Sequence, residues 1–122
     1  MIDHVILNVR DYRRSRDFYE PTLAALGFEV VMAFDDGAGF GHDGKPEFWI
    51  AQREPVGGST HVALHVDHRA DVDAFHAAAL AAGGRDHGAP GVREHYHPNY
   101  YGAFVLDPDG NNIEAVCHAP AS

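Results

Sequence analysis

The chain has 122 residues, a formal net charge of −9 and a hydrophobic content of 45%. This length and composition are typical of one globular domain with a sizeable core, and we take residues 1–122 as a single domain. The acidic charge and the lack of a basic run argue against binding to nucleic acid or to anionic membranes. Cys117 is the only cysteine, and no leader or long apolar segment is visible, so we expect a cytoplasmic protein.

The first part of the chain predicts a strand, a helix and three further strands. In order, these elements are expected at 3–9, 12–26, 28–33, 38–42 and 47–52. Pro21 is expected to kink or shift the helix, and Gly27 to end it. Together they make a first module of about residues 1–54, followed by a Pro- and Gly-rich linker.

The second part repeats this order over about residues 59–119. A strand, a helix and two later strands are expected at 60–66, 70–82, 100–106 and 112–118. Residues 85–99 are polar and contain Gly, Pro, His and Tyr, which predicts a long loop with room for a short strand.

The two modules share a sequence pattern at a constant offset of 57 residues. His4 corresponds to His61, Phe18 to Phe75 and Gly27 to Gly84. An offset that persists over about 25 residues indicates a repeated supersecondary unit. The fold class is therefore α+β, built from two βαβββ modules.

Strand alternation predicts a metal site on the face of the strands that points away from the helices. His61 and His65 share that face, His4 lies there by the same phase, and Glu114 lies there in the last strand. Two histidines and one carboxylate form a set that suits a divalent metal with open positions. Glu47 is the expected counterpart of Glu114 in the fourth strand, either as a further ligand or as a surface carboxylate at a strand end.

Other polar and aromatic residues are candidates for catalysis. His65 is either a partner of a ligand and proton relay or a polar residue facing the cavity. His97 and Tyr101, in a segment that also contains His95, Tyr96 and Tyr100, would act as acid–base groups or oxyanion donors. The alternative is that this aromatic segment packs over the edge of the sheet. Of Phe48 and Trp49, one should face the core and the other the cavity; Cys117 should be core.

Several motifs resemble the vicinal oxygen chelate superfamily, which includes glyoxalases, bleomycin resistance proteins and extradiol dioxygenases. They are His4 at the first strand, Phe18-Tyr19, Leu26-Gly27-Phe28, His61-Val62-Ala63, and the run from Ala103 to Glu114 with its Asp-Pro-Asp-Gly turn. The resemblance covers residues 2–118. It implies a curved eight-stranded mixed sheet around a central cavity, with the helices outside.

The resemblance also implies a site and a function. It makes His4, His61 and Glu114 the metal ligands, with Glu47 near the position of a further carboxylate in glyoxalase I-like members. The leading hypothesis is a metal-dependent lyase or dioxygenase that uses Fe, Zn, Ni or Mn and acts on a small substrate with vicinal oxygens. The alternatives are a metal-free protein that sequesters a small ligand, and a structural module without chemistry.

Exposed strand edges predict a homodimer. If the two modules of one chain do not close on each other, the site is expected to combine residues from two chains.

Overall fold

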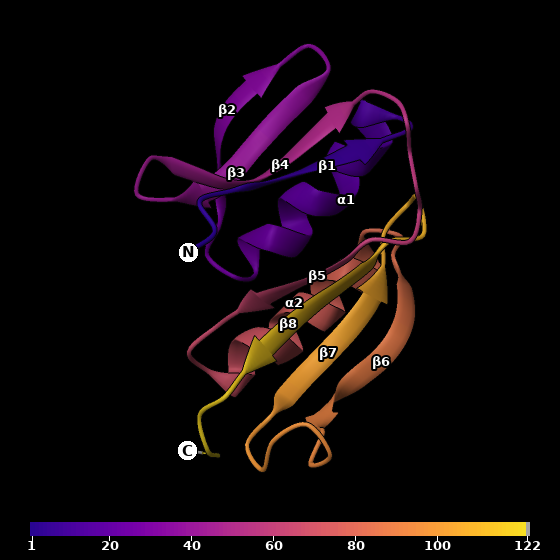
Figure 1. The fold of residues 1–122 in the computed structure, drawn as a ribbon. Helices are drawn as coiled ribbons and strands as arrows, with labels where there is room; N and C mark the ends of the chain where they lie inside the picture. The colour runs from indigo at the N-terminus through magenta and orange to yellow at the C-terminus, as the bar shows by residue number, and fades with distance from the viewer. Residues whose placement is uncertain (122) are drawn as a thin grey trace.

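The computed structural model describes residues 1–121 and contains the two predicted βαβββ modules (Figure 1). The first module consists of β1 (Val5–Val9), α1 (Tyr12–Ala24), β2 (Glu29–Phe34), β3 (Gly37–His42) and β4 (Lys45–Gln52). The second consists of β5 (His61–His65), α2 (Arg69–Ala81), β6 (Arg85–Val92), β7 (Tyr101–Leu106) and β8 (Asn112–Cys117). The α+β class and the repeat of modules are thus confirmed.

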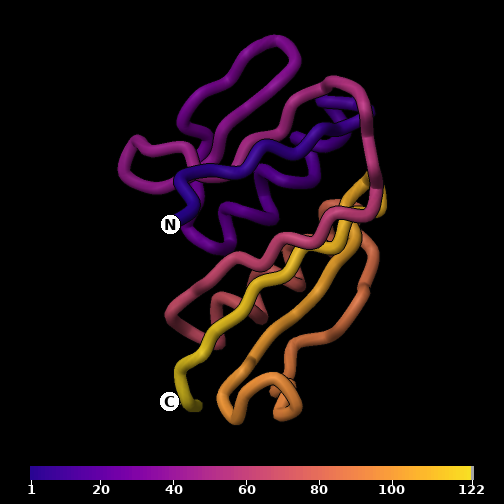
Figure 2. Tube along the Cα trace, in the orientation of Figure 1, coloured from indigo at the N-terminus to yellow at the C-terminus, as the bar shows by residue number. Residues whose placement is uncertain are grey.

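The strands form two four-stranded sheets of matching topology, with the orders β1-β4-β3-β2 and β5-β8-β7-β6. In each sheet the first pair is parallel and the other pairs are antiparallel. Figure 2 follows the connection from the end of β4 along one side of the molecule to β5. The two sheets do not close into one around a cavity, so the open face of each is left uncovered by the other.

The segment predicted as a long loop contains an eight-residue strand, β6, from Arg85 to Val92. It pairs with β7 in an irregular register, with shifts between Asp86 and Gly88 and between Gly88 and Gly91. These irregularities remove the regular alternation by which a strand is recognised in a sequence. Pro90 is tolerated because β6 is at the edge of its sheet.

A single hydrophobic core joins the two modules, and the helices lie within it. Phe18 and Tyr19 of α1 and Phe75 of α2 are almost completely buried in the same cluster. Cys117 belongs to this core and Phe48 is buried, while Trp49 on the next position faces outward, as the alternation predicts. In the described residues, no helix has the length and apolarity needed to cross a membrane.

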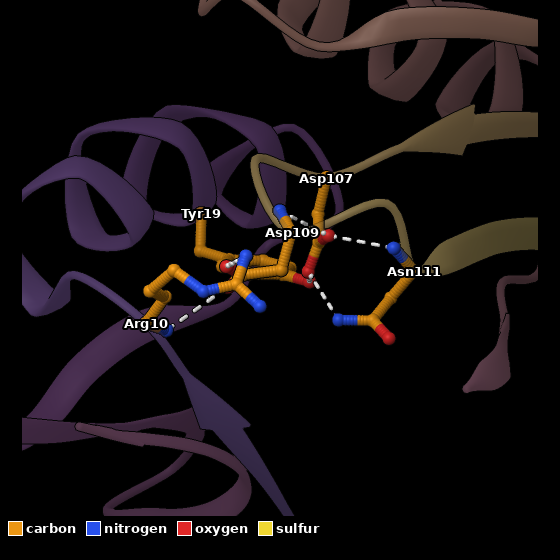
Figure 3. Close-up of polar contacts among 5 residues, drawn as sticks. All are labelled: Arg10, Tyr19, Asp107, Asp109 and Asn111. Carbon is orange, nitrogen blue, oxygen red and sulfur yellow. Dashed lines mark hydrogen bonds and ion pairs between the residues drawn. The ribbon is translucent and has the colours of Figure 1, made fainter. Parts of the chain in front are cut away.

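A buried polar network fixes the β7–β8 turn of the second module against α1 of the first (Figure 3). The Tyr19 hydroxyl donates to Asp107 Oδ2 at 2.5 Å, and Asn111 donates to the same carboxylate through its backbone N at 2.8 Å and its side-chain Nδ2 at 3.0 Å. The Asp109 backbone N adds a further donor at 2.9 Å. Asp107 is only 2% exposed, so these four donors replace the water that its carboxylate loses on folding.

The same network sets the start of β5. The side-chain oxygen of Asn111 accepts a hydrogen bond from the Thr60 backbone N at 3.0 Å, and the Asn112 backbone N donates to the Thr60 carbonyl at 2.8 Å. Thr60 directly precedes His61, so the Asp-Pro-Asp-Gly turn helps to place the first residue of β5.

Candidate functional site

His61 and Glu114 meet on the open face of the second sheet. β5 pairs with β8 in parallel, with Ala63 opposite Glu114, so the two side chains emerge on the same face of neighbouring strands. His61 Nε2 lies 2.8 Å from Glu114 Oε1. Glu114 is only 1% exposed, whereas about half of the His61 side chain is open to solvent. An imidazole and a buried carboxylate in contact are a donor pair that fits a divalent transition metal.

The second oxygen of Glu114 is held by Tyr100, whose hydroxyl donates to Oε2. Burial, and next the hydrogen bond to Glu114, raise the pKa of Tyr100, so its phenol keeps its proton and acts as a donor. Gly102 leaves space for both groups, because a Cβ there would lie 3.2 Å from Tyr100 Cε1 and 3.4 Å from Glu114 Oε2.

A pocket of about 340 Å³ opens over this arrangement. Besides the three groups just described, namely His61, Tyr100 and Glu114, it is lined by Tyr96 and Phe104. The chemical groups at its base are therefore polar and its walls are aromatic, an arrangement common in sites for small molecules.

The other predicted ligand, His4, lies apart from this pair. Its Nδ1 is 2.8 Å from Asp3 Oδ1, and it shares with His61 the lining of a groove of about 620 Å³ between the two modules. Within residues 1–121, no three His, Cys, Asp or Glu side chains come close enough together to hold a metal ion. One chain therefore supplies two neighbouring donors and leaves His4 outside the pair.

The pairing register corrects the position assigned to Glu47. Ile6 is equivalent to Ala63 by the 57-residue offset; Ala63 pairs with Glu114, but Ile6 pairs with Trp49. Trp49, not Glu47, is thus the counterpart of Glu114. Glu47 lies on the same side of β4 two residues earlier, with its Oε2 3.7 Å from His42 Nδ1. The modules differ in length before β4, which shifts the sequence offset by the time that strand begins.

Of the predicted catalytic residues, Tyr101 points away from the site. Its hydroxyl donates to Asp73 Oδ1 of α2 at 2.6 Å, and the Arg69 guanidinium lies 5.0 Å from its ring centroid. Tyr100, one residue earlier, contacts Glu114 instead. Strand alternation accounts for the difference, because Tyr101 pairs with the core residue Cys117.

His65 and His97 lie beside the pocket, around His118. The His118 ring centroid is 5.8 Å from that of His65, 5.7 Å from that of His97 and 5.3 Å from that of Tyr100. Nδ1 of His97 accepts a hydrogen bond from the Asn99 backbone N at 3.0 Å. His118 is exposed, and its ring connects those of His65 and His97 to Tyr100 of the site.

Phe104 was not predicted to belong to the site, although the alternation of side chains along its strand indicates its position. It alternates with Gly102 along β7 and pairs with Glu114, so it must share the face of that carboxylate. Its ring centroid is 6.1 Å from that of His61.

Replacing Tyr100 by Phe should destabilise the protein by about 1–3 kcal/mol, because it leaves one oxygen of a buried carboxylate without a donor. Tyr101→Phe is the matched control. It removes an exposed hydrogen bond to Asp73 and should cost less than about 1 kcal/mol. Urea unfolding of both variants measures the difference, and equal losses would contradict the role given to Tyr100.

A second hollow, of about 490 Å³, lies on the first sheet and is mainly apolar. Phe34 and Trp49 form its aromatic wall, with their ring planes nearly parallel at 13° and their centroids 6.4 Å apart. Ile6 also lines it, together with the cationic residues Lys45 and Arg53. The first module thus has an aromatic surface at the position where the second module has Glu114.

Comparisons with known proteins agree with this architecture. A family model described as the Glyoxalase/Bleomycin resistance protein/Dioxygenase superfamily matches residues 1–115. The chain is similar to a glyoxalase/bleomycin resistance protein from Albidiferax ferrireducens, with 30% identity, a TM-score of 0.82, and coverage of 93% of this chain and 96% of the other. No curated protein matches the chain.

Two further solved structures share the fold at lower identity. A glyoxalase/bleomycin resistance protein/dioxygenase family enzyme from Burkholderia phytofirmans is 23% identical with a TM-score of 0.72, and 97% of this chain and 98% of that one are covered. A glyoxalase-related enzyme from Fulvimarina pelagi is 18% identical with a TM-score of 0.73, with 96% and 87% covered.

Proposed function

Because the chain belongs to the glyoxalase/bleomycin resistance protein/dioxygenase superfamily, we propose that it is a metal-dependent enzyme acting on a small substrate with two adjacent oxygens. The observation that carries this proposal is the contact of His61 Nε2 with the buried Glu114 Oε1, 2.8 Å apart at the base of an aromatic pocket. Burying a carboxylate costs free energy unless a partner offsets the loss of water. In this pair the His61 imidazole is a partner of Glu114, and the two side chains together provide two metal donors.

In this proposal His61 and Glu114 hold the metal, and His4 is the third ligand. A bound divalent ion would act as a Lewis acid that polarises the substrate oxygens. Tyr100 fixes one oxygen of Glu114 and leaves the other directed to His61. The aromatic walls formed by Tyr96 and Phe104 would orient a flat substrate over the donors.

We assign the third ligand to a second copy of the chain. The open face of the first sheet carries Ile6, Met32 and Phe34, which are 46%, 48% and 60% exposed. An apolar face of this kind is favourable to cover, and in a twofold dimer the first sheet of each copy covers the second sheet of the other. His4, which directly precedes β1, would then approach His61 and Glu114 of its partner.

Mixing two inactive variants tests this arrangement. His4→Ala and Glu114→Ala are each expected to lose metal, measured by elemental analysis of untagged protein after separate exposure to Fe, Zn, Ni and Mn. If the site is shared, a dimer of the two variants contains one intact site. Random exchange of subunits should then restore about a quarter of the wild-type metal content.

The matched control is a mixture of His61→Ala and Glu114→Ala. Both changes affect the same half of the site, so no intact site can form and no metal should return. Metal in the wild type without recovery in the first mixture would show that the ligands come from one chain. Absence of metal in the wild type after exposure to all four ions would overturn the enzyme proposal.

The hollow of the first module favours a second candidate function, a metal-free protein that binds a flat small ligand. A flat ligand would stack on the aromatic surface of Phe34 and Trp49, in a hollow that charged side chains of both signs also line, namely Asp3, Asp36, Lys45 and Arg53. A wild-type protein without metal would move the assignment to this function.

A further inference from the structure

Arg93 packs against Phe104, which lines the pocket of the second module. Its Nη1 donates to the Gly91 carbonyl and its Nη2 to the Ala89 carbonyl, both at 2.8 Å. The carbon Cζ of its guanidinium lies 5.4 Å from the ring centroid of Phe104, which lines the pocket. The guanidinium is therefore fixed on the side of the sheet where Glu114 and His61 lie.

The irregular strand β6 provides the carbonyl groups that bind this guanidinium. The pairing with β7 shifts on both sides of Gly88, and both bonded carbonyls belong to this strand. A Cβ at Gly88 would lie 3.2 Å from Nη2, and one at Gly91 would lie 3.1 Å from Nη1. Bulges commonly redirect side chains next to functional sites, and here the glycines leave the space that the guanidinium occupies.

Most of the hydrogen-bonding capacity of Arg93 remains available. A guanidinium has five N–H donors, and the two carbonyl contacts occupy two of them. Throughout residues 1–121, no carboxylate forms an ion pair with Arg93, although the chain as a whole carries a charge of −9. A fixed guanidinium without an acidic partner is suited to bind a carboxylate in two parallel hydrogen bonds.

Phe104 lies close to both Arg93 and His61. The Phe104 centroid is 6.1 Å from the His61 centroid and 5.4 Å from Arg93 Cζ, so the His61 ring and the guanidinium are no more than 11.5 Å apart, the sum of these distances. One aromatic ring with its substituents fits within that limit. Stacking on Phe104 or Tyr96 would direct one end of such a molecule to His61 and the other to Arg93.

We infer that the substrate is a small aromatic acid whose carboxylate binds Arg93 while two adjacent oxygens on the ring face His61 and Glu114. This inference rests on the proposed function, because it names the substrate class of the same site. Arg93 is then a specificity-determining residue. The competing explanation is that Arg93 only secures β6 through its carbonyl contacts and its packing on Phe104.

The test compares two ligands that differ only in the charge of one group, 3,4-dihydroxybenzoate and 3,4-dihydroxybenzamide, in which this group lies across the ring from the two hydroxyls. Their affinities are measured by calorimetry or by nuclear magnetic resonance titration, with metal-free and with zinc-loaded protein. The wild type should bind the acid at least about tenfold more tightly than the amide in both states, as expected for charge-assisted hydrogen bonds.

Arg93→Met keeps the packing on Phe104 and removes the charge, so it should bring the acid-to-amide ratio close to one while amide binding persists. Arg93→Gln serves as a second variant without the charge. Arg85→Met is the matched control, because Arg85 is an exposed arginine at the other end of the same strand. It should leave the ratio unchanged.

Several outcomes would overturn the inference: no preference for the acid in the wild type, an unchanged ratio in the folded Arg93 variants, or failure of both variants to fold, which would assign Arg93 to structure alone. A protein that takes up no metal would refute the proposed function. The ratio measured with metal-free protein would still decide the role of Arg93.

Discussion

Replacing Asp107 by Ala is expected to lower the free energy of unfolding by about 3–5 kcal/mol, because several buried donors lose their acceptor at about 1–3 kcal/mol each. Asp107 is 2% exposed and accepts hydrogen bonds from Tyr19, Asp109 and Asn111. Without the carboxylate, these donors stay buried with no acceptor. Urea unfolding followed by the fluorescence of Trp49 and by circular dichroism measures the loss.

Two controls separate the network from a general effect of substitution. Tyr19→Phe removes one of the donors to Asp107 and should cost about 1–2 kcal/mol. Asp35→Ala changes an exposed aspartate in the β2–β3 turn and should stay within about 0.5 kcal/mol of the wild type. A loss below about 1 kcal/mol for Asp107→Ala would contradict the structural role of the network.

The network also connects the fold to the site. Asn111 contacts Asp107 through two donors and accepts from the Thr60 backbone N, next to His61. The Asp-Pro-Asp-Gly turn therefore stabilises the structure around the site. It holds the second module against α1 and, by fixing Thr60, it determines where β5 begins.

The elements of this fold could be predicted from the sequence wherever local patterns agree with the final environment. The 57-residue repeat identifies both modules, and α1 and α2 follow from their apolar spacing. The module pattern leaves room for the strand β6, but its bounds and its length of eight residues were not predicted, because its irregular pairing with β7 and its Gly and Pro residues remove the alternation on which such a prediction depends.

For the site, the sequence predicts which face of its strand a side chain occupies, but it does not predict which residues pair between neighbouring strands. Alternation places His61 and Glu114 together, but it cannot give the distance between strands of different modules, so the separation of His4 was not foreseeable. The offset between equivalent residues is 57 for Ile6 and Ala63 but 65 for Trp49 and Glu114, because the modules differ in length before their last strands. The whole set of metal ligands thus remains a prediction to be tested in solution.

Glu114→Gln should reduce the affinity for a divalent metal by more than about 100-fold while leaving the metal-free fold nearly intact. Glutamine has the same shape, and its amide can still accept from Tyr100 and donate to His61. The metal, however, loses an anionic ligand, which should weaken binding beyond the 10–100-fold typical when an outer partner of a ligand is removed. The buried position makes this loss hard for water to replace.

Thermal unfolding with and without metal reads out this loss without an enzyme assay. A metal present at about 1,000 times its Kd adds roughly 4 kcal/mol to the stability of the wild type, whereas Glu114→Gln should gain less than about 1.4 kcal/mol at the same concentration. Glu47→Gln is the matched control, because Glu47 lies two residues from the position equivalent to Glu114. If both variants lose the stabilisation, Glu47 is a fourth ligand; if neither does, the metal binds elsewhere and the proposed site is wrong.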